Sequence, residues 1–416
     1  MSRSLVSRPY GALWVCALLL AACGDRPPVV QEADTGPLIP DSASVRVMSD
    51  SVPAWGDTQP WTISARPTLE LGTPGQTFVG VAPVLQLSDG RIVIADGSRQ
   101  AVRYFGPDGE LLPSAGGSGA TDGQFHGLGW IGRAAGDTVV AYDFVVRRLT
   151  VFDSEGRMVH TVPLLSAEPD APAVPLGTFT DGSILFRIGG PASPFAGQPG
   201  AILRDSASYM RFTLDGTPVA SLGRFPQGES FGVQVRPNQP PQPFPVAYGL
   251  STVAALRADT MLVGTAAEFA IAEIAPDGTP VGLLRAPIAR AKVTSAESKA
   301  YTRKALERLE SAVNAKLDTA LVRSLRQAPF PERKPAYGRF LVDATGALWV
   351  SGPLSPPDPP TEWTVFSPEG AWLGTMTTPD QFRVDEIGTD YLLGVLRSAD
   401  GQERIQRYAL SRGAGN

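Results

Sequence analysis

The chain has 416 residues, a formal net charge of −5, two cysteines and two histidines. This mild acidity gives no electrostatic reason to bind nucleic acid. Two histidines, His126 and His160, are too few for a multi-histidine zinc site. Cys16 lies in a segment that we expect to be removed, so we also expect no disulfide in the mature chain.

Residues 1–22 have the pattern of a signal peptide. Arg3 and Arg8 precede an apolar run, residues 11–20, that is too short to span a bilayer. Leu-Ala-Ala-Cys at residues 20–23 resembles the lipobox of bacterial lipoproteins, which implies that Cys23 carries the lipid. We therefore expect a lipoprotein held through Cys23 on the extracytoplasmic side of a bacterial membrane, inner or outer. An ordinary cleaved signal is the alternative.

Residues 23–60 are rich in Pro, Asp, Ser and Gly and show no periodicity. Such a composition predicts a flexible tether between the anchor and a folded domain.

Residues 61–411 contain two interleaved series of hairpin signals. In the first series an acid and a glycine separate two apolar runs, with the glycine at 109, 156, 216, 278 and 370. The second series has six turns, at residues 88–90, 135–137, 180–182, 258–260, 344–346 and 388–390. Glycine adopts the positive φ that tight hairpin turns need. Two hairpins make a four-stranded antiparallel blade, so the chain is predicted to be an all-β, six-bladed β-propeller.

The sixth unit lacks an outer strand, while residues 61–72 have no partner of their own. We expect this N-terminal strand to pair with residues 403–410 and to close the last blade, because a closed ring leaves no sticky edge.

The first two units also resemble a known family. Residues 116–125, Gly-Gly-Ser-Gly-Ala-Thr-Asp-Gly-Gln-Phe, match the glycine-rich motif of NHL-repeat propellers, and residues 94–96 and 102–105 match its second and third strands. The match covers about residues 75–165, and His126 stands where the family usually has proline. The whole chain is similar to uncharacterised six-bladed propeller lipoproteins of bacteria, a resemblance that implies a fold and no activity.

Loops of antiparallel blades alternate between two faces of the ring. The long insertions, residues 189–208, 225–247, 286–336 and 352–361, all fall on one face, here called the inserted face. The opposite face, here called the turn face, has only tight turns, which we expect to be too short to form a pocket. Insertions gathered on one face of a rigid scaffold indicate a binding surface.

The largest insertion, about residues 288–336 between the fourth and fifth blades, carries the predicted helix. Thr294 and Glu297 form a capping box, and apolar residues recur every three or four positions from Leu306 to Leu325. An unbroken helix would be awkwardly long, so we expect a break near residues 314–318. The helix could be a cap over the inserted face or a docking element for a partner.

Five residues are candidates for ligand binding at the mouth of the channel on the inserted face. Tyr248 and Tyr337 occupy matching Ala-Tyr-Gly sequences, Arg339 and Arg383 begin innermost strands, and Arg187 ends a second strand. Guanidinium groups at a channel mouth would suit a carboxylate, a phosphate or an acidic peptide.

The sequence gives weaker evidence for catalysis than for ligand binding. None of the three asparagines falls in a predicted inner strand, so we expect no metal or cofactor, and His126 is the one weak candidate for a catalytic base. Asp96 and Asp143 are expected to bond the backbone of the turns that follow them. The sequence thus favours a lipid-anchored extracytoplasmic propeller that acts as a ligand-binding or protein-interaction module. The alternative is an envelope hydrolase or lyase of the lactonase-like propeller type with an atypical site.

Overall fold

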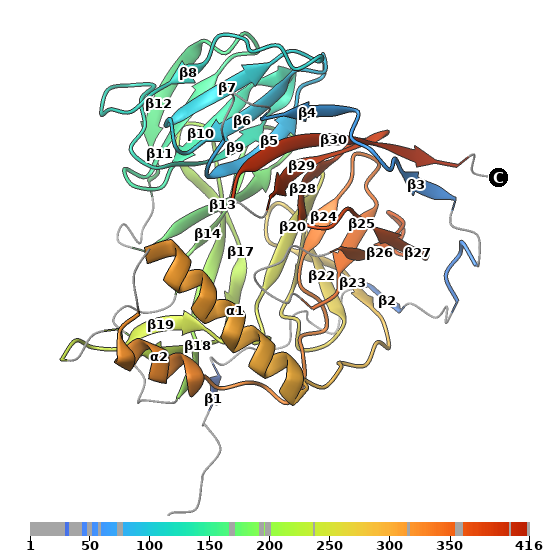
Figure 1. Ribbon diagram of the computed structural model, residues 1–416. Coiled ribbons are helices and arrows are strands. Elements are labelled where there is room, and N and C mark those ends of the chain that lie inside the picture. Colours follow the sequence, from blue (N-terminus) through green and yellow to red (C-terminus); the bar gives the residue numbers. More distant parts are fainter. Residues whose placement is uncertain are drawn as a thin grey trace, which may run out of the picture.

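The computed structural model describes residues 30–32, 44–47, 52–56, 60–72, 78–165, 171–190, 195, 201–235, 238–313, 317–353, 361–398 and 401–413. These residues form mostly β-strands, with two α-helices that lie together on one side of the molecule (Figure 1). None of the described helices is long and apolar enough to cross a membrane.

Six sheets follow one another along the chain, numbered here sheets 1 to 6, and their own strands pair antiparallel. Sheet 1 contains β5 (Val81–Gln86), β6 (Ile92–Asp96), β7 (Ala101–Phe105) and β8 (Ala115–Gly116). Sheet 2 contains β9 (Leu128–Arg133), β10 (Val139–Asp143), β11 (Arg148–Phe152) and β12 (Met158–Pro163), with a short 3-10 turn at Ala135–Asp137. Sheet 3 contains β13 (Ala173–Thr178), β14 (Ile184–Ile188), β16 (Ser206–Phe212) and β17 (Pro218–Pro226).

The remaining three sheets repeat the pattern. Sheet 4 contains β20 (Val253–Arg257), β21 (Thr260–Gly264), β22 (Ala270–Ile274) and β23 (Pro280–Arg285). Sheet 5 contains β24 (Phe340–Val342), β25 (Leu348–Ser351), β26 (Glu362–Phe366) and β27 (Trp372–Thr377). Sheet 6 contains β28 (Phe382–Ile387), β29 (Tyr391–Arg397), β30 (Glu403–Arg412) and two N-terminal strands, β3 (Trp61–Ile63) and β4 (Leu69–Leu71).

The hairpin turns have the backbone conformation that the sequence predicts. The five glycines of the first series, at 109, 156, 216, 278 and 370, have φ between 79° and 91°. This region is strained for residues with a side chain, which explains why glycine recurs at this point of the repeat.

The first strands of the six sheets surround a central axis. Strands β5, β9, β13, β20, β24 and β28 contact one another in that order, and β28 contacts β5 again. Arg383 Nη2 donates to Val81 O at 2.9 Å near the start of two of these strands, and Gln86 N donates to Glu386 Oε2 at 2.8 Å near their ends, so β5 and β28 run in the same direction. The apolar core lies between neighbouring sheets, as where Tyr142 and Phe186 meet edge to face at 5.1 Å. The prediction of an all-β propeller of four-stranded antiparallel sheets is confirmed.

The predicted pairing between the two ends of the domain is present. Leu71 of β4 is the register partner of Ile405 in β30, and Trp61 of β3 is the partner of Arg412. Leu71 and Ile405 are both buried. Residues more than 330 positions apart therefore share one sheet and one core.

The segment predicted to be a flexible tether is partly ordered. Strand β2 (Ser44–Val47) pairs parallel with β23, and the backbone N–H of Trp55 donates to Leu373 O at 2.9 Å. The Trp55 ring lies 5.0 Å from that of Trp61. The prediction of a tether over residues 23–60 is therefore wrong for these residues, because hydrogen bonds to sheet edges and aromatic packing offset the entropy lost on ordering. Cys23 and the signal segment lie outside the described residues.

Two insertions form a small accessory sheet that the sequence did not predict. Its strands are β15 (Ile202–Arg204), β18 (Ser230–Val233) and β19 (Gln242–Pro245), joined by β1 (Val30–Glu32) along the edge of β15. Helices α1 (Ser295–Val313) and α2 (Thr319–Arg326) pack beside this sheet through Leu306, Leu309 and Leu325 (Figure 1). Three of the four insertions, residues 189–208, 225–247 and 286–336, thus share a core of their own.

The predicted helix start and helix break are both confirmed. Thr294 N donates to Glu297 Oε2 at 2.9 Å, and Glu297 N donates to Thr294 Oγ1 at 3.2 Å, which is a capping box. The first helix spans Ser295–Val313, and the second begins at Thr319 with Asp318 as its N-cap. The break is seen at residues 317 and 318, while residues 314–316 lie outside the described residues.

Candidate functional site

A cavity of 730 Å³ runs along the centre of the ring. Residues from the first strands of all six sheets line it, and none of the described side chains of α1 or α2 does. This volume falls within the range of small-molecule binding sites. We call this cavity the channel.

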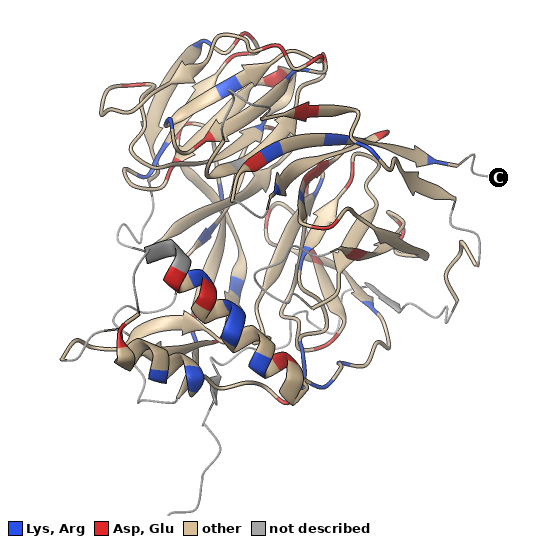
Figure 2. Ribbon diagram, viewed as in Figure 1, with Lys and Arg blue, Asp and Glu red and all other residues tan. Residues whose placement is uncertain are grey.

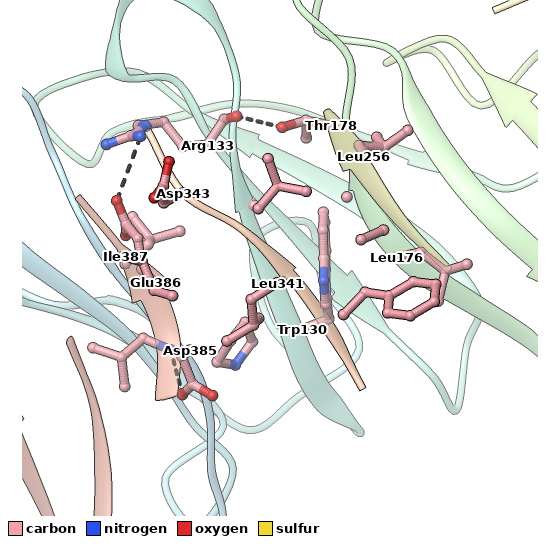
Figure 3. A pocket seen from close by; sticks show the side chains of 18 of the residues that line it. Trp130, Arg133, Leu176, Thr178, Leu256, Leu341, Asp343, Asp385, Glu386 and Ile387 are labelled. Carbon is pink, nitrogen blue, oxygen red and sulfur yellow. Dashed lines mark hydrogen bonds and ion pairs between the residues drawn. The ribbon is translucent and has the colours of Figure 1, made fainter. Parts of the chain in front are cut away.

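The wall of the channel is apolar on one side and polar on the other. Figure 3 shows Trp130, Leu176, Leu256 and Leu341 together on the apolar side. Asp385 and Glu386 stand opposite them, with Arg133 above (Figure 3). Two consecutive strand residues normally point to opposite faces, but the pairing of β28 with β29 shifts its register between Val384 and Glu386. This bulge lets both carboxylates line the channel.

Charges are paired at the turn-face end of the channel. Glu386 accepts from Tyr391 Oη at 2.8 Å and from Gln86 N at 2.8 Å, and Arg133 Nη2 lies 3.5 Å from its Oε1. Burial raises the pKa of Glu386 above the usual glutamate range, although Arg133 acts to lower it. Asp343, which also lines this end, forms an ion pair with Arg412 at 2.9 Å.

The charged side chains at the inserted-face end of the channel are arranged differently. Arg383 donates from Nε to Asp385 Oδ1 at 2.8 Å and from Nη2 to Asp385 Oδ2 at 2.9 Å. Val84 N donates to the same carboxylate at 3.2 Å. This two-point contact holds the guanidinium of Arg383 in a fixed plane at the channel wall.

Arg339 lines the same end of the channel as this pair. Its guanidinium lines the channel and forms no hydrogen bond or ion pair with any residue that the structure describes. Burial lowers the pKa of Arg339, the negative charge of Asp385 acts to raise it, and the positive charge of Arg383 acts to lower it. Among the residues that line this end of the channel, two guanidinium groups stand beside one carboxylate, that of Asp385. Glu403 also attracts Arg383, but it forms an ion pair with Arg397, so the lining of this end keeps a net positive charge.

The other predicted ligand-binding residues lie outside the channel. Tyr337 is 1% exposed, and its hydroxyl donates to Ala270 O at 2.8 Å and accepts from Ala266 N at 3.2 Å. Tyr248 is buried beneath the helices, with its ring 6.2 Å from that of Tyr301. The prediction that both tyrosines stand at the channel mouth is wrong, because their rings fill gaps between packed elements.

Arg187 also departs from the prediction. It is the register partner of Tyr209, which packs in the core between sheets 3 and 4, so its side chain lies between sheets rather than at the channel.

His126 is exposed in the loop before β9, and its imidazole forms no hydrogen bond with a described residue. Its backbone N–H donates to Asp143 Oδ2 at 2.7 Å, and the other oxygen of Asp143 accepts from Val145 N at 2.8 Å. Asp143 therefore bonds the backbone as predicted. In the described part of the chain, no acid bonds the ring of His126 and orients it as a catalytic base would require.

The prediction that the turn face forms no pocket is wrong. A hollow of 590 Å³ lies between the two turns of sheet 1, lined by residues that include Asp89, Arg91 and Asp108. Two short turns can enclose a hollow when they stand side by side at the edge of one sheet.

Sequence reasoning found Arg339 and Arg383 but missed Asp385, Glu386 and Trp130. The adjacent acids Asp385 and Glu386 in a predicted inner strand were the available signal, because acidic residues are rare in a buried strand unless they are paired. Trp130 gave no such signal, since an aromatic residue in a strand is ordinary.

Charge elsewhere on the molecule is mixed. Figure 2 shows acidic and basic residues interspersed over the sheets and along α1. Among the described residues, no three His, Cys, Asp or Glu side chains gather in a group that could hold a metal ion.

No protein-family model matches the chain, and no curated protein matches it significantly in sequence. Solved structures resemble it weakly. A protein from Bacteroides fragilis described as exported has 12% identity and a TM-score of 0.46 over 89% of this chain and 99% of its own. Virginiamycin B lyase from Staphylococcus aureus has 10% identity and a TM-score of 0.40 over 84% and 99% of the two chains. A gluconolactonase from Xanthomonas campestris has 17% identity and a TM-score of 0.39 over 88% and 99%.

Proposed function

We propose that the chain is a lipid-anchored, extracytoplasmic six-bladed propeller whose blades are sheets 1 to 6, and that it binds a small anionic ligand in the channel. The observation that carries this proposal is the guanidinium of Arg339, which has no partner among the described residues and lies beside the Arg383–Asp385 pair. A ligand would enter from the inserted face, where the strands that bear both arginines begin.

A carboxylate or phosphate fits this arrangement. Asp385 occupies Nε and Nη2 of Arg383, and no described hydrogen bond uses Nη1. An anion between the two guanidinium groups would pair with Arg339 and with that remaining nitrogen. Charge-assisted hydrogen bonds of this kind are about twice as strong as neutral ones. The anion would also supply the negative charge that this end of the channel lacks.

Calorimetric titration of the mature chain with acetate and with inorganic phosphate tests this proposal. We expect saturable binding of at least one anion, and we expect Arg339→Ala to weaken it by about tenfold to a hundredfold, the loss of one charged hydrogen bond. Arg157→Ala is the matched control, because Arg157 is an exposed arginine outside the channel that pairs with Asp153. Equal weakening by both substitutions, or no binding of either anion, would contradict the proposal.

The anchor requires a separate test. The lipobox-like sequence before Cys23 supports attachment of lipid at this residue. We expect Cys23→Ser to move the protein from the membrane fraction to the soluble envelope fraction. Membrane retention of the variant, with mass spectrometry showing no lipid on the wild-type N-terminus, would show that the anchor is assigned wrongly.

A further inference from the structure

Exposed apolar side chains lie beside the channel on the inserted face. In the turn between β10 and β11, Phe144 is 40%, Val145 67% and Val146 39% exposed. Val79, in the connection that leads into β5, is 60% exposed. Three consecutive apolar residues exposed in a tight turn are a feature that folding of the sheet does not require.

Packing holds the Phe144 turn against the channel mouth. The Phe144 ring covers Gly129, a residue of the channel wall, so closely that a Cβ atom added to Gly129 would lie 2.8 Å from two ring carbons. The ring of Tyr142 packs against the Phe144 ring edge to face, with 5.1 Å between the ring centroids. Val145 approaches Gly127 in the same way. Because Gly127 and Gly129 have no side chains, Val145 and Phe144 can pack directly against the backbone at the start of β9.

Around the channel mouth, the exposed apolar residues lie next to the two arginines. Arg339 lies in sheet 5 and Arg383 in sheet 6, and Arg383 donates to the carbonyl of Val81, two residues after Val79. Phe144 and Val145 belong to sheet 2, and β5 of sheet 1 contacts both β28 and β9. Around the mouth, a cationic sector over sheets 5 and 6 is therefore followed by an apolar sector over sheets 1 and 2.

We propose that the ligand of the channel is an amphipathic carboxylate, with its carboxylate on Arg339 and Arg383 and its hydrocarbon part against Phe144, Val145 and Val79. This inference rests on the anion-binding function proposed above. Charge complementarity fixes the position of the head group, and burial of exposed apolar surface on both partners favours the chain. An anion without an apolar body would leave the apolar sector in water.

Titration with straight-chain carboxylates from acetate to octanoate, kept below their micelle concentrations, tests the inference. In the soluble full chain carrying Cys23→Ser, each methylene that becomes buried should tighten binding by about threefold to fourfold. Phe144→Ser with Val145→Ser should remove most of this gain and leave acetate binding within about twofold. Val219→Ser is the matched control, because Val219 is 53% exposed on the outer strand β17.

The outcomes separate the two proposals. If acetate and phosphate bind but affinity does not rise with chain length, the amphipathic ligand is wrong and the anion site stands. If no anion binds at any chain length, both proposals fall. If the Phe144 and Val145 substitutions lower binding to phosphatidylcholine vesicles and leave the octanoate gain intact, the apolar sector contacts the membrane, which also overturns this inference.

Discussion

The two ends of the channel are built from the same strands but differ in charge. At the turn-face end, Arg133 forms an ion pair with Glu386, and Arg412 forms one with Asp343. At the inserted-face end, Arg383 pairs with Asp385 and Arg339 has no partner among the described residues. Arg339 is partly buried, and its guanidinium is the one on which the proposed anion site rests.

The largest expected effect comes from opening the ring on which both ends depend. We expect deletion of residues 24–72 to lower the thermal midpoint by roughly 10 °C or more, since Leu69, Leu71 and Trp61 together contribute on the order of 5 kcal/mol of burial. Closure also positions Glu403, which accepts from Val81 N at 2.8 Å where β5 begins. Calorimetry measures the change.

Deletion of residues 24–50 is the control, because it keeps both β3 and β4. If the longer deletion melts like the control, the N-terminal strands do not stabilise the ring.

A direct test of the difference between the two ends compares removal of the ion pair at the turn-face end with removal of one arginine at the inserted-face end. We expect Arg133→Gln with Glu386→Gln to change anion affinity by less than about twofold, because the pair has no net charge. Arg339→Gln should weaken binding by about tenfold or more, because it removes a charged donor. Calorimetric titration with the same anion compares the two. Equal losses would mean that the ends of the channel do not differ in function.

A smaller effect is expected from ionic strength, which should change how much the arginine substitutions weaken anion binding. If Arg339 acts through its charge, Arg339→Ala and Arg383→Ala should weaken binding more at low ionic strength than at high, since the screening length falls from about 30 Å at 0.01 M to about 10 Å at 0.1 M salt. The measurement is the ratio of wild-type to variant dissociation constants at the two salt concentrations. A ratio that does not change with salt would assign the arginines a role in shape rather than charge.

The smallest expected effect concerns pH at the turn-face end. Because burial raises the pKa of Glu386, the native state keeps a proton at pH values where the unfolded chain has released it. The free energy of unfolding should therefore fall as pH rises above about 4.3, the usual glutamate value. Glu386→Gln should flatten this part of the profile, as thermal melts at several pH values would show. An identical slope in the variant would contradict a raised pKa.

Local patterns determined much of the fold in advance. The five glycine turns, the capping box of Thr294 and Glu297 and the helix break before Thr319 all depend on residues a few positions apart. The pairing of β4 with β30 was predictable because a propeller leaves a single incomplete blade for a single spare strand. In each case, residues close together in the sequence or the repeat pattern itself specify the interaction that fixes the structure.

Tertiary structure decided which polar residues form the site. Arg339 and Arg187 are both arginines at the ends of predicted strands, yet one lines the channel and the other lies between sheets. Tyr337 is buried because its hydroxyl finds backbone partners in sheet 4, and Asp385 faces the channel because β28 is bulged. Such outcomes depend on side-chain direction and on partners far away in the chain. The sequence alone determined the repeat and its turns, and only packing across sheets decided which arginine lines the channel without a partner among the described residues.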